Sequence, residues 1–308
     1  MAPATSPREH EQEFRSGFVA VIGRPNVGKS TLVNRLVGRT VAIVSDKAQT
    51  TRHRIMGVVH LPAAQIVLLD TPGIHRPRHL LGRWMLQVAE RSLKDADLVL
   101  FMVDGSSRRP GPGDTHVAQR VASARARAVL VINKMDLVPP GEGPAVTAAY
   151  EELGDFVDTV PISARTGAGT DRLLELIVDH LPPGPPYFPP GMHTDQPERV
   201  LAAEFIREQV LHLTRDEVPH AVGVDIEEMT PRSGGKVYIR AVIYVERESQ
   251  KGILIGQGGN LLKAVGSGAR ERIETLLGEP VYLDLWVKVS KKWRDRAGSL
   301  RALGFRQE

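Results

Sequence analysis

Short, uniformly apolar runs alternate with segments of helical length through the first 180 residues. Strands that are buried on both faces read as continuous apolar runs, and helices between them place neighbouring strands parallel. The pattern therefore predicts an α/β fold with a mostly parallel sheet. The apolar runs lie at residues 18–22, 65–69, 98–103, 128–132 and 157–162.

A proline-rich segment follows this first pattern, with six prolines in nine positions from Pro182 to Pro190. Proline fixes φ and has no N–H, so it obstructs both helical and ladder hydrogen bonding. We expect a fairly stiff boundary between two domains here.

The hydrophobic pattern changes after the linker. It predicts a helix over residues 199–213, strands over 221–229 and 236–246, a helix over 260–277 and a last strand over 281–289, in which apolar and polar residues alternate. These elements predict a small α+β domain.

Composition narrows the functional classes. The 42% hydrophobic and 25% charged content is ordinary for a globular chain, and 308 residues are enough for two cores. With no cysteine, the chain has no disulfide or thiolate metal site, which favours a reducing, cytoplasmic compartment. Residues 1–16 contain three glutamates and no apolar run, which predicts a flexible extension rather than a targeting signal. The longest apolar run is far below the roughly 20 residues of a membrane span.

Charge is unevenly distributed. The net charge is +4, but residues 200–250 carry 6 Lys and Arg against 9 Asp and Glu, and residues 251–308 carry 11 against 6. The basic C-terminal stretch is what a phosphate-binding face requires, although a solvated surface gives the same count.

The sequence GRPNVGKS follows the first apolar run and precedes a helical segment. A chain of backbone N–H groups at a helix N-terminus binds phosphates, and glycines keep side chains out of the way. Lys29 would reach the β- and γ-phosphates, and Ser30 would ligate Mg²⁺. The candidate residues are Gly23, Arg24, Pro25, Asn26, Val27, Gly28, Lys29, Ser30 and Thr31.

A second motif, DTPG, follows the run at 65–69. Asp70 would hold Mg²⁺ and the Gly73 N–H would meet the γ-phosphate. In the polar stretch between the two motifs we choose Thr51 as the mobile threonine that meets Mg²⁺, with Thr50 as the alternative. The candidate residues of the second motif are Asp70, Thr71, Pro72, Gly73 and Ile74.

The sequence NKMD, which closes the run at 128–132, predicts the base. A carboxylate accepts two hydrogen bonds from guanine, whereas adenine would leave Asp136 unpaired. The candidate base-pocket residues are Asn133, Lys134, Met135, Asp136, Ser163 and Ala164.

Ile74 stands where small GTPases of the Ras type carry the glutamine that orients the attacking water. An isoleucine cannot position water, so another group must help. Asn26 is similar to the asparagine that helps to hold K⁺ beside the phosphates in potassium-activated relatives, which predicts K⁺ stimulation. The candidate catalytic residues are Asn26, Lys29, Thr51 and Gly73.

A GXXG sequence directly before the helix at residue 260 predicts an RNA-binding loop, since glycines let the backbone approach the phosphates of a single strand. With a helical segment before this loop, the element order is α-β-β-α-α-β, which is that of a type II KH domain. The candidate residues are Lys251, Ile255, Gly256, Gln257, Gly258, Gly259 and Lys263. The tail mixes Trp293 with lysines and arginines, which suits RNA, an anionic membrane, or a helix docked by Trp293 and Leu303.

Taken together, GRPNVGKS, QTTR, DTPGIH, NKMD, SA and IGQGG resemble the bacterial Era family of ribosome-assembly GTPases over residues 17 to about 296. The resemblance implies GTP hydrolysis with Mg²⁺, binding near the 3′ end of 16S rRNA, maturation of the 30S subunit and loose association with the inner membrane face. We expect a monomer. The expected parts are an extension (1–16), a GTP-binding domain (17–181), a linker (182–198), a KH domain (199–290) and a basic tail (291–308).

Three other functions compete with this one. A GTPase of tRNA modification would need a C-terminal cysteine, and the sequence has no cysteine. A tandem GTPase would need a second GxxxxGKS motif, and the sequence has only one. A passive RNA-binding scaffold with a vestigial nucleotide site conflicts with the intact Lys29, Ser30, Asp70 and Asp136.

Overall fold

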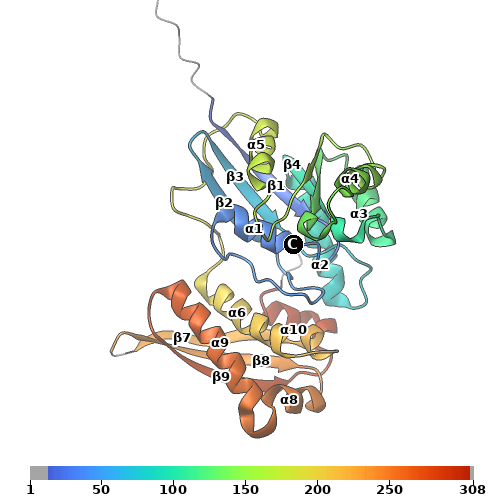
Figure 1. Ribbon diagram of the computed structural model, residues 1–308. Helices are drawn as coiled ribbons and strands as arrows, with labels where there is room; N and C mark the ends of the chain where they lie inside the picture. Colours follow the sequence, from blue (N-terminus) through green and yellow to red (C-terminus); the bar gives the residue numbers. More distant parts are fainter. Residues whose placement is uncertain (1–12, 233, 306–308) are drawn as a thin grey trace, which may run out of the picture.

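The computed structural model describes residues 13–232 and 234–305, which form two sheets with helices packed on them (Figure 1). Most of the predicted N-terminal extension, residues 1–12, lies outside the described residues. β1 (Arg15–Ile22) begins inside that extension, because Arg15 and Ser16 pair with the next strand of the sheet. The extension is thus shorter than residues 1–16.

The first sheet has six strands in the order β2-β3-β1-β4-β5-β6. All neighbours are parallel except β2 and β3, which run antiparallel. The sequence pattern missed the edge strand β2, whose run is interrupted by Gly57 and His60. The other bounds are β2 (Ile55–Leu61), β3 (Ala64–Asp70), β4 (Leu98–Asp104), β5 (Ala128–Asn133) and β6 (Asp158–Pro161).

Helices cover both faces of this sheet, as the continuous apolar strands require. Alternate β1 residues face opposite cores: Val19 and Val21 pack with α1 and α5, and Ala20 and Ile22 pack with α2, α3 and α4. The predicted α/β fold class is therefore confirmed. The bounds are α1 (Lys29–Val37), α2 (Leu80–Asp95), α3 (Pro112–Ser123), α4 (Gly143–Glu151) and α5 (Thr170–His180), with short 3₁₀ turns η1 (Gly105–Ser107) and η2 (Met135–Leu137).

The proline-rich linker contacts β1, β2 and β3, and the buried Gln65 of β3 holds its backbone. The Gln65 Oε1 atom accepts hydrogen bonds from the backbone N–H of Tyr187 (2.7 Å) and Phe188 (3.0 Å), and its Nε2 donates to the Phe188 carbonyl. An isolated bridge joins Thr194 to Gly57 in β2. The predicted stiffness of the linker thus has a second source, because its backbone is tied to the sheet.

The second sheet, β7-β8-β9, has helices α6 and α9 on one face (Figure 1). β7 and β8 are antiparallel, and β8 and β9 are parallel. The predicted element order is present, with one additional short helix, α7. The bounds are α6 (Glu198–Leu213), α7 (Val218–Ala221), β7 (Gly223–Arg232), β8 (Lys236–Val245), α8 (Glu248–Ile255), η3 (Gln257–Gly259), α9 (Asn260–Leu277) and β9 (Val281–Val289).

The C-terminal tail folds back between the two sheets as η4 (Trp293–Asp295) and α10 (Ala297–Ala302). Trp293 is fully buried and donates its indole N–H to the Ala221 carbonyl at 2.8 Å. It clusters with Leu300, Phe305 and residues of α2. The docked-helix alternative describes the tail, and the Trp293 ring is not available for stacking on bases or inserting into a membrane.

Residues 43–53, here called the switch segment, lie between α1 and β2 of the first domain and contact the second domain. Ile43 belongs to the second domain's hydrophobic core. Arg52 is 3% exposed and donates to the Val222 carbonyl at 2.5 Å, and Arg207 of α6 donates to the Thr50 carbonyl. The conformation of the switch segment is therefore coupled to the docking of the second domain.

His53 gives this contact region a dependence on pH. Its ring stacks on Phe305 with centroids 4.2 Å apart, and burial lowers its pKa from 6.5 to about 4, with Arg207 and Arg52 adding to the shift. The unfolded chain binds a proton near pH 6.5 and the folded chain does not, so stability falls as the pH drops from 6.5 to 4.

We expect the wild-type free energy of unfolding to fall by about 1 kcal/mol per pH unit more than that of His53→Phe in this window. The phenylalanine keeps the stacking and does not titrate. Urea unfolding of both proteins at several pH values between 4 and 7.5 measures the difference. Parallel pH profiles would show that His53 carries no such penalty.

Among the described residues, no helix combines the length and apolar character that a membrane span requires.

Candidate nucleotide site and RNA-binding loop

The phosphate loop connects β1 to the first turn of α1, as predicted from its sequence. Gly28 has φ 102° and Asn26 has φ 66°, so the chain turns twice through the left-handed region and directs backbone N–H groups into one concavity. A Cβ on Gly28 would lie 2.4 Å from Asn133 Nδ2. The glycine is required here by both the backbone and the packing.

Lys29 lies in this concavity with its ammonium group folded onto the loop. It donates to the carbonyls of Gly23 (3.4 Å) and Arg24 (3.1 Å) and is 6% exposed. Burial lowers its pKa to about 8, although Asp70 opposes the shift. Asp70 compensates the charge of the buried ammonium group only in part, so an anionic phosphate would bind to it favourably.

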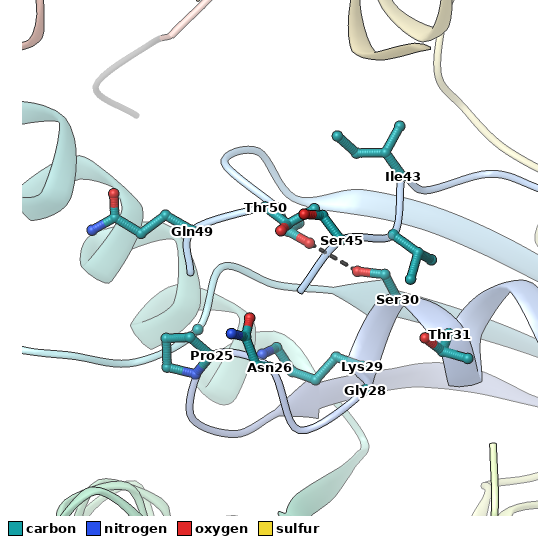
Figure 2. Close-up of a pocket in the computed structure, with 13 residues that line it drawn as sticks. Pro25, Asn26, Gly28, Lys29, Ser30, Thr31, Ile43, Ser45, Gln49 and Thr50 are labelled. Carbon is teal, nitrogen blue, oxygen red and sulfur yellow. Dashed lines mark hydrogen bonds between the residues drawn. The ribbon is translucent and has the colours of Figure 1, made fainter. Parts of the chain in front are cut away.

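Three oxygen-bearing side chains from three segments, Ser30, Thr51 and Asp70, converge beside the phosphate loop. Ser30 lines the cavity next to Lys29 (Figure 2). Ser30 Oγ donates to Asp70 Oδ2 at 2.7 Å and lies 2.9 Å from Thr51 Oγ1, and Thr51 Oγ1 lies 3.3 Å from Asp70 Oδ2. Asp70 is fully buried, which raises its pKa, and its Oδ1 has no hydrogen-bond partner among the described residues.

This donor set fits Mg²⁺, which prefers hard oxygen ligands and is bound with few protein side chains and substrate phosphates. A divalent cation would also compensate the buried Asp70 carboxylate. Of the two candidate threonines, Thr51 meets Ser30 and Asp70, whereas the Thr50 hydroxyl donates to the Lys47 carbonyl at 2.6 Å.

The segment after Asp70 packs its side chains away from the cavity. Thr71 is buried and donates to the Val21 carbonyl. Ile74 is 2% exposed in the core that β1 shares with α2, and only its N–H meets the phosphate loop, at the Gly23 carbonyl. The Ile74 side chain therefore does not line the cavity, and the prediction that Ile74 is a nucleotide-binding residue rests on its backbone alone. Gly73 lines the cavity.

Asn133 connects the expected base loop to the phosphate loop. Its Nδ2 donates to the Val27 carbonyl at 2.8 Å, and its Oδ1 accepts from the Ala164 N–H at 2.8 Å. Lys134 forms an ion pair with Asp104 at 2.7 Å and has φ 65°. Asn133 thus braces the two loops and brings Ala164 beside the NKMD sequence.

Asp136 is held ionised at the open end of this loop. Hydrogen bonds from Ser163 and from Arg165, which is 2.5 Å away, lower the pKa of its carboxyl. An ionised carboxylate is the acceptor that two guanine N–H donors require. Met135 lies between the predicted base residues, with its backbone N–H bonded to the Ile162 carbonyl.

The GXXG loop joins α8 to α9 and contains three glycines with positive φ: Gly256 (71°), Gly258 (61°) and Gly259 (79°). A Cβ on Gly256 would lie 2.9 Å from Leu261 Cβ, whereas one on Gly258 would meet open space. Gln257, Gly258 and Lys263 are exposed, and Lys251 and Ile255 are half-buried. The loop therefore offers an accessible backbone with a nearby cation.

Four residues of these sites were missed in the sequence. Gln49 and Ile43 line the nucleotide cavity from the switch segment. Arg165 pairs with Asp136, and Ile253 is 50% exposed in α8 next to the GXXG loop. Arg165 had a sequence signal, because it directly follows Ser163 and Ala164, and Gln49 stands in the QTTR motif. The positions of Ile43 and Ile253 depend on how the two domains fold.

Comparison with known proteins agrees with this geometry. The family model described as "50S ribosome-binding GTPase" matches residues 18–134, and the KH domain model matches residues 217–294. A GTPase Era of Heliobacterium modesticaldum is 51% identical over 294 residues, which are 96% of this chain and 98% of the relative. The chain belongs to the Era GTPase family.

Solved structures of Era resemble the whole chain. A complex of Era with MgGDPNP and nucleotides 1506–1542 of 16S ribosomal RNA has a TM-score of 0.92 at 42% identity and covers 96% of this chain and all of the other. A substituted Aquifex aeolicus Era bound to GDP·AlF₄⁻ has a TM-score of 0.91 at 42% identity with the same coverage. The predictions of the Era family, of the GTPase activity and of a G domain followed by a KH domain are confirmed.

Proposed function

We propose that this chain couples GTP hydrolysis to binding of single-stranded RNA near the 3′ end of 16S rRNA, and acts in maturation of the 30S subunit. One observation carries the coupling: adjacent residues of the switch segment serve both domains. Thr51 lies in the Ser30–Asp70 oxygen cluster, and Arg52 is bonded to the KH domain through Val222. The RNA recorded with a related Era supports the choice of RNA.

The residues of the nucleotide cavity have the following proposed roles. Lys29 binds the β- and γ-phosphates, and the Gly73 N–H binds the γ-phosphate. Ser30, Thr51 and Asp70 would hold Mg²⁺, which when bound neutralises phosphate charge. Asp136 reads guanine, with Asn133, Lys134, Ser163 and Ala164 fixing the shape of the pocket.

A bound γ-phosphate stabilises the conformation of the switch segment in which Thr51 faces the cavity, because the Thr51 hydroxyl then lies beside Ser30. Release of phosphate removes that stabilisation. Since Arg207 bonds the Thr50 carbonyl and Arg52 bonds the KH domain, a shift of the segment also shifts the KH contacts. The reverse must hold for equilibrium binding, so RNA that favours one docking arrangement changes nucleotide affinity.

Multiple-turnover GTP hydrolysis, with and without a short single strand matching the 3′ end of 16S rRNA, tests the proposal. We expect the matching RNA to stimulate hydrolysis and a scrambled strand of equal length to have little effect. Hydrolysis that no strand changes would leave a GTPase whose RNA coupling is absent.

Gly258→Asp is expected to lower RNA affinity about 10-fold or more and to leave hydrolysis without RNA intact. The position is exposed with open space around it, and aspartate tolerates a positive φ, so the added charge repels phosphates without clashing. Filter binding with the matching strand measures the loss.

Gly234→Asp is the matched control, since Gly234 also has positive φ and open surroundings but lies in the β7–β8 hairpin. Equal loss of RNA affinity in both variants would move the RNA site away from the GXXG loop.

We propose K⁺ as a further cofactor. Asn26 donates its Nδ2 to the Asp46 carbonyl at 2.7 Å, so its Oδ1 remains as a cation ligand next to the switch segment. Hydrolysis is expected to run about 10-fold faster in K⁺ than in Na⁺, because the cation supplies positive charge beside the phosphates. Asn26→Gly keeps the positive φ and should remove the difference between the salts. Equal rates of the wild type in both salts would contradict this prediction.

The cellular setting is also proposed: a cytoplasmic monomer with weak attachment to the inner membrane face. The exposed Lys291 and Lys292 of the tail support an electrostatic attachment. The division into residues 17–181, 182–198, 199–290 and 291–308 is likewise a proposal. It is supported by the change from one sheet to the other on the two sides of the linker.

A further inference from the structure

The buried Ile74 leaves the attacking water without an obvious partner. In-line attack on the γ-phosphate requires a hydrogen-bonding group that orients the water. The Ile74 side chain lies in the core at 2% exposure, and Pro25, on the other side of Gly73, has no N–H. The approach of Gly73 is so close that a Cβ on it would lie 2.7 Å from Pro25 N. The polar group must come from another wall of the cavity.

Gln49 is on that wall. It lines the cavity together with Pro25 and Gly73, and Figure 2 shows it on the switch segment at the Pro25 side of the cavity, with its amide turned away from Lys29 and Ser30. Its φ is 64°, a left-handed conformation that glycine adopts freely and glutamine does not. Backbone strain clusters at functional sites, so Gln49 is a candidate for a role in this cavity.

His75 fixes the orientation of this side chain. The His75 Nδ1 lies 2.8 Å from the Gly73 carbonyl, which only accepts, so Nδ1 carries the hydrogen. In the neutral ring Nε2 is then an acceptor, and it lies 2.8 Å from Gln49 Nε2. The amide nitrogen of Gln49 is therefore the donor in this contact, and its carbonyl oxygen, Oε1, remains as an acceptor.

Other polar side chains of the same cavity have different contacts. The Thr50 hydroxyl donates to the Lys47 carbonyl, and Thr51 lies in the oxygen cluster with Ser30 and Asp70. The Asn26 amide donates to the Asp46 carbonyl. Gln49 is the uncharged side chain that pairs with the residue directly after Ile74, so it connects the switch segment to the loop that closes over the γ-phosphate position.

We infer that Gln49 is the residue that orients the attacking water, and that His75 positions Gln49. This inference rests on the proposed GTP hydrolysis. In the step, the water oxygen bonds to the γ-phosphorus while the bond from that phosphorus to the β–γ bridging oxygen breaks. The electron pair leaves with GDP. The water proton passes to a γ-phosphate oxygen, which gives dihydrogen phosphate. Gln49 Oε1 accepts a hydrogen bond from the water and takes no proton.

The test is single-turnover GTP hydrolysis by the full chain in K⁺ buffer. Gln49→Leu, which keeps the size and loses the amide, is expected to lower the rate constant about 10- to 100-fold. Affinity for GDPNP should stay within about twofold, because Gln49 binds the water and not the nucleotide. Affinity for GDP·AlF₄⁻, which mimics the transition state, should fall in step with the rate.

His75→Phe keeps the ring and removes both nitrogens. It should slow hydrolysis by less than Gln49→Leu, and the double variant should be no slower than Gln49→Leu alone, because the two residues act as one unit. Gln119→Leu is the matched control, since Gln119 is exposed on α3. It should hydrolyse GTP at the wild-type rate.

A Gln49→Leu rate within twofold of the wild type overturns the inference and leaves the proposed function standing. Loss of GDPNP affinity in proportion to the rate also overturns it, because Gln49 would then act in nucleotide binding. A wild-type chain that hydrolyses no GTP, even with K⁺ and the matching RNA, overturns the proposed function and this inference together.

Discussion

Lys29→Ala is expected to lower GTP affinity about 100- to 1000-fold, since charge-assisted hydrogen bonds to two phosphates contribute about 1.5–3 kcal/mol each. The ammonium group lies in the concavity at the start of α1, where it donates to the Gly23 and Arg24 carbonyls. Equilibrium titration with a fluorescent guanine nucleotide measures the loss. Wild-type affinity in the variant would contradict the proposed phosphate site.

We do not expect the Lys29→Ala substitution to destabilise the nucleotide-free protein. Burial lowers the Lys29 pKa from 10.5 to about 8. At pH 7 the folded chain therefore carries a buried charge, which lowers the free energy of unfolding by an amount on the order of 3 kcal/mol. Removing that charge offsets the lost packing. We expect a melting temperature equal to or above that of the wild type.

Lys94→Ala is the matched control, because Lys94 is exposed in the last turn of α2. It should change neither nucleotide affinity nor melting temperature. A large fall in the melting temperature of Lys29→Ala alone would instead assign the lysine a structural role.

Asp136→Asn is expected to lower GTP affinity about 100-fold and to raise affinity for xanthosine triphosphate. A carboxylate accepts from two guanine donors, whereas asparagine offers one donor and one acceptor, which match the N–H and carbonyl edge of xanthine. The wild-type carboxylate is ionised and fixed by Ser163 and Arg165. Competition between the two nucleotides measures the selectivity.

Asp136→Ala separates base reading from loop damage. It removes the acceptor without adding a donor, so it should weaken binding of both nucleotides. If Asp136→Asn keeps the wild-type preference for guanine, the base is read by another group.

The order of motifs along the chain could be predicted because each depends on local sequence. The phosphate loop needs glycines at its turns and a helix directly after it, and both requirements are met between Gly23 and Ser30. Strands buried on both faces are visible as apolar runs, so five of the first sheet's strands were expected. The edge strand β2 was missed because His60, which is exposed, and Gly57 interrupt its run.

Contacts between distant segments were not visible in the sequence. Gln49 and His75 stand in two separate motifs, QTTR and DTPGIH, 26 residues apart, and only the fold brings the two side chains within 2.8 Å. The choice between Thr50 and Thr51 was open for the same reason, since adjacent hydroxyls in an irregular loop have no periodicity that separates them.

The sequence by itself thus determined the chemistry that each motif can perform: phosphate and guanine binding in the first domain, and a GXXG loop in the second. Only the tertiary structure decided how the domains are joined. Arg52 and Trp293 look like surface residues of a basic loop and a basic tail, yet the fold buries both between the domains, with the Arg52 guanidinium 5.8 Å from the Trp293 ring. Burial of such residues depends on long-range packing, which local hydrophobic periodicity does not contain.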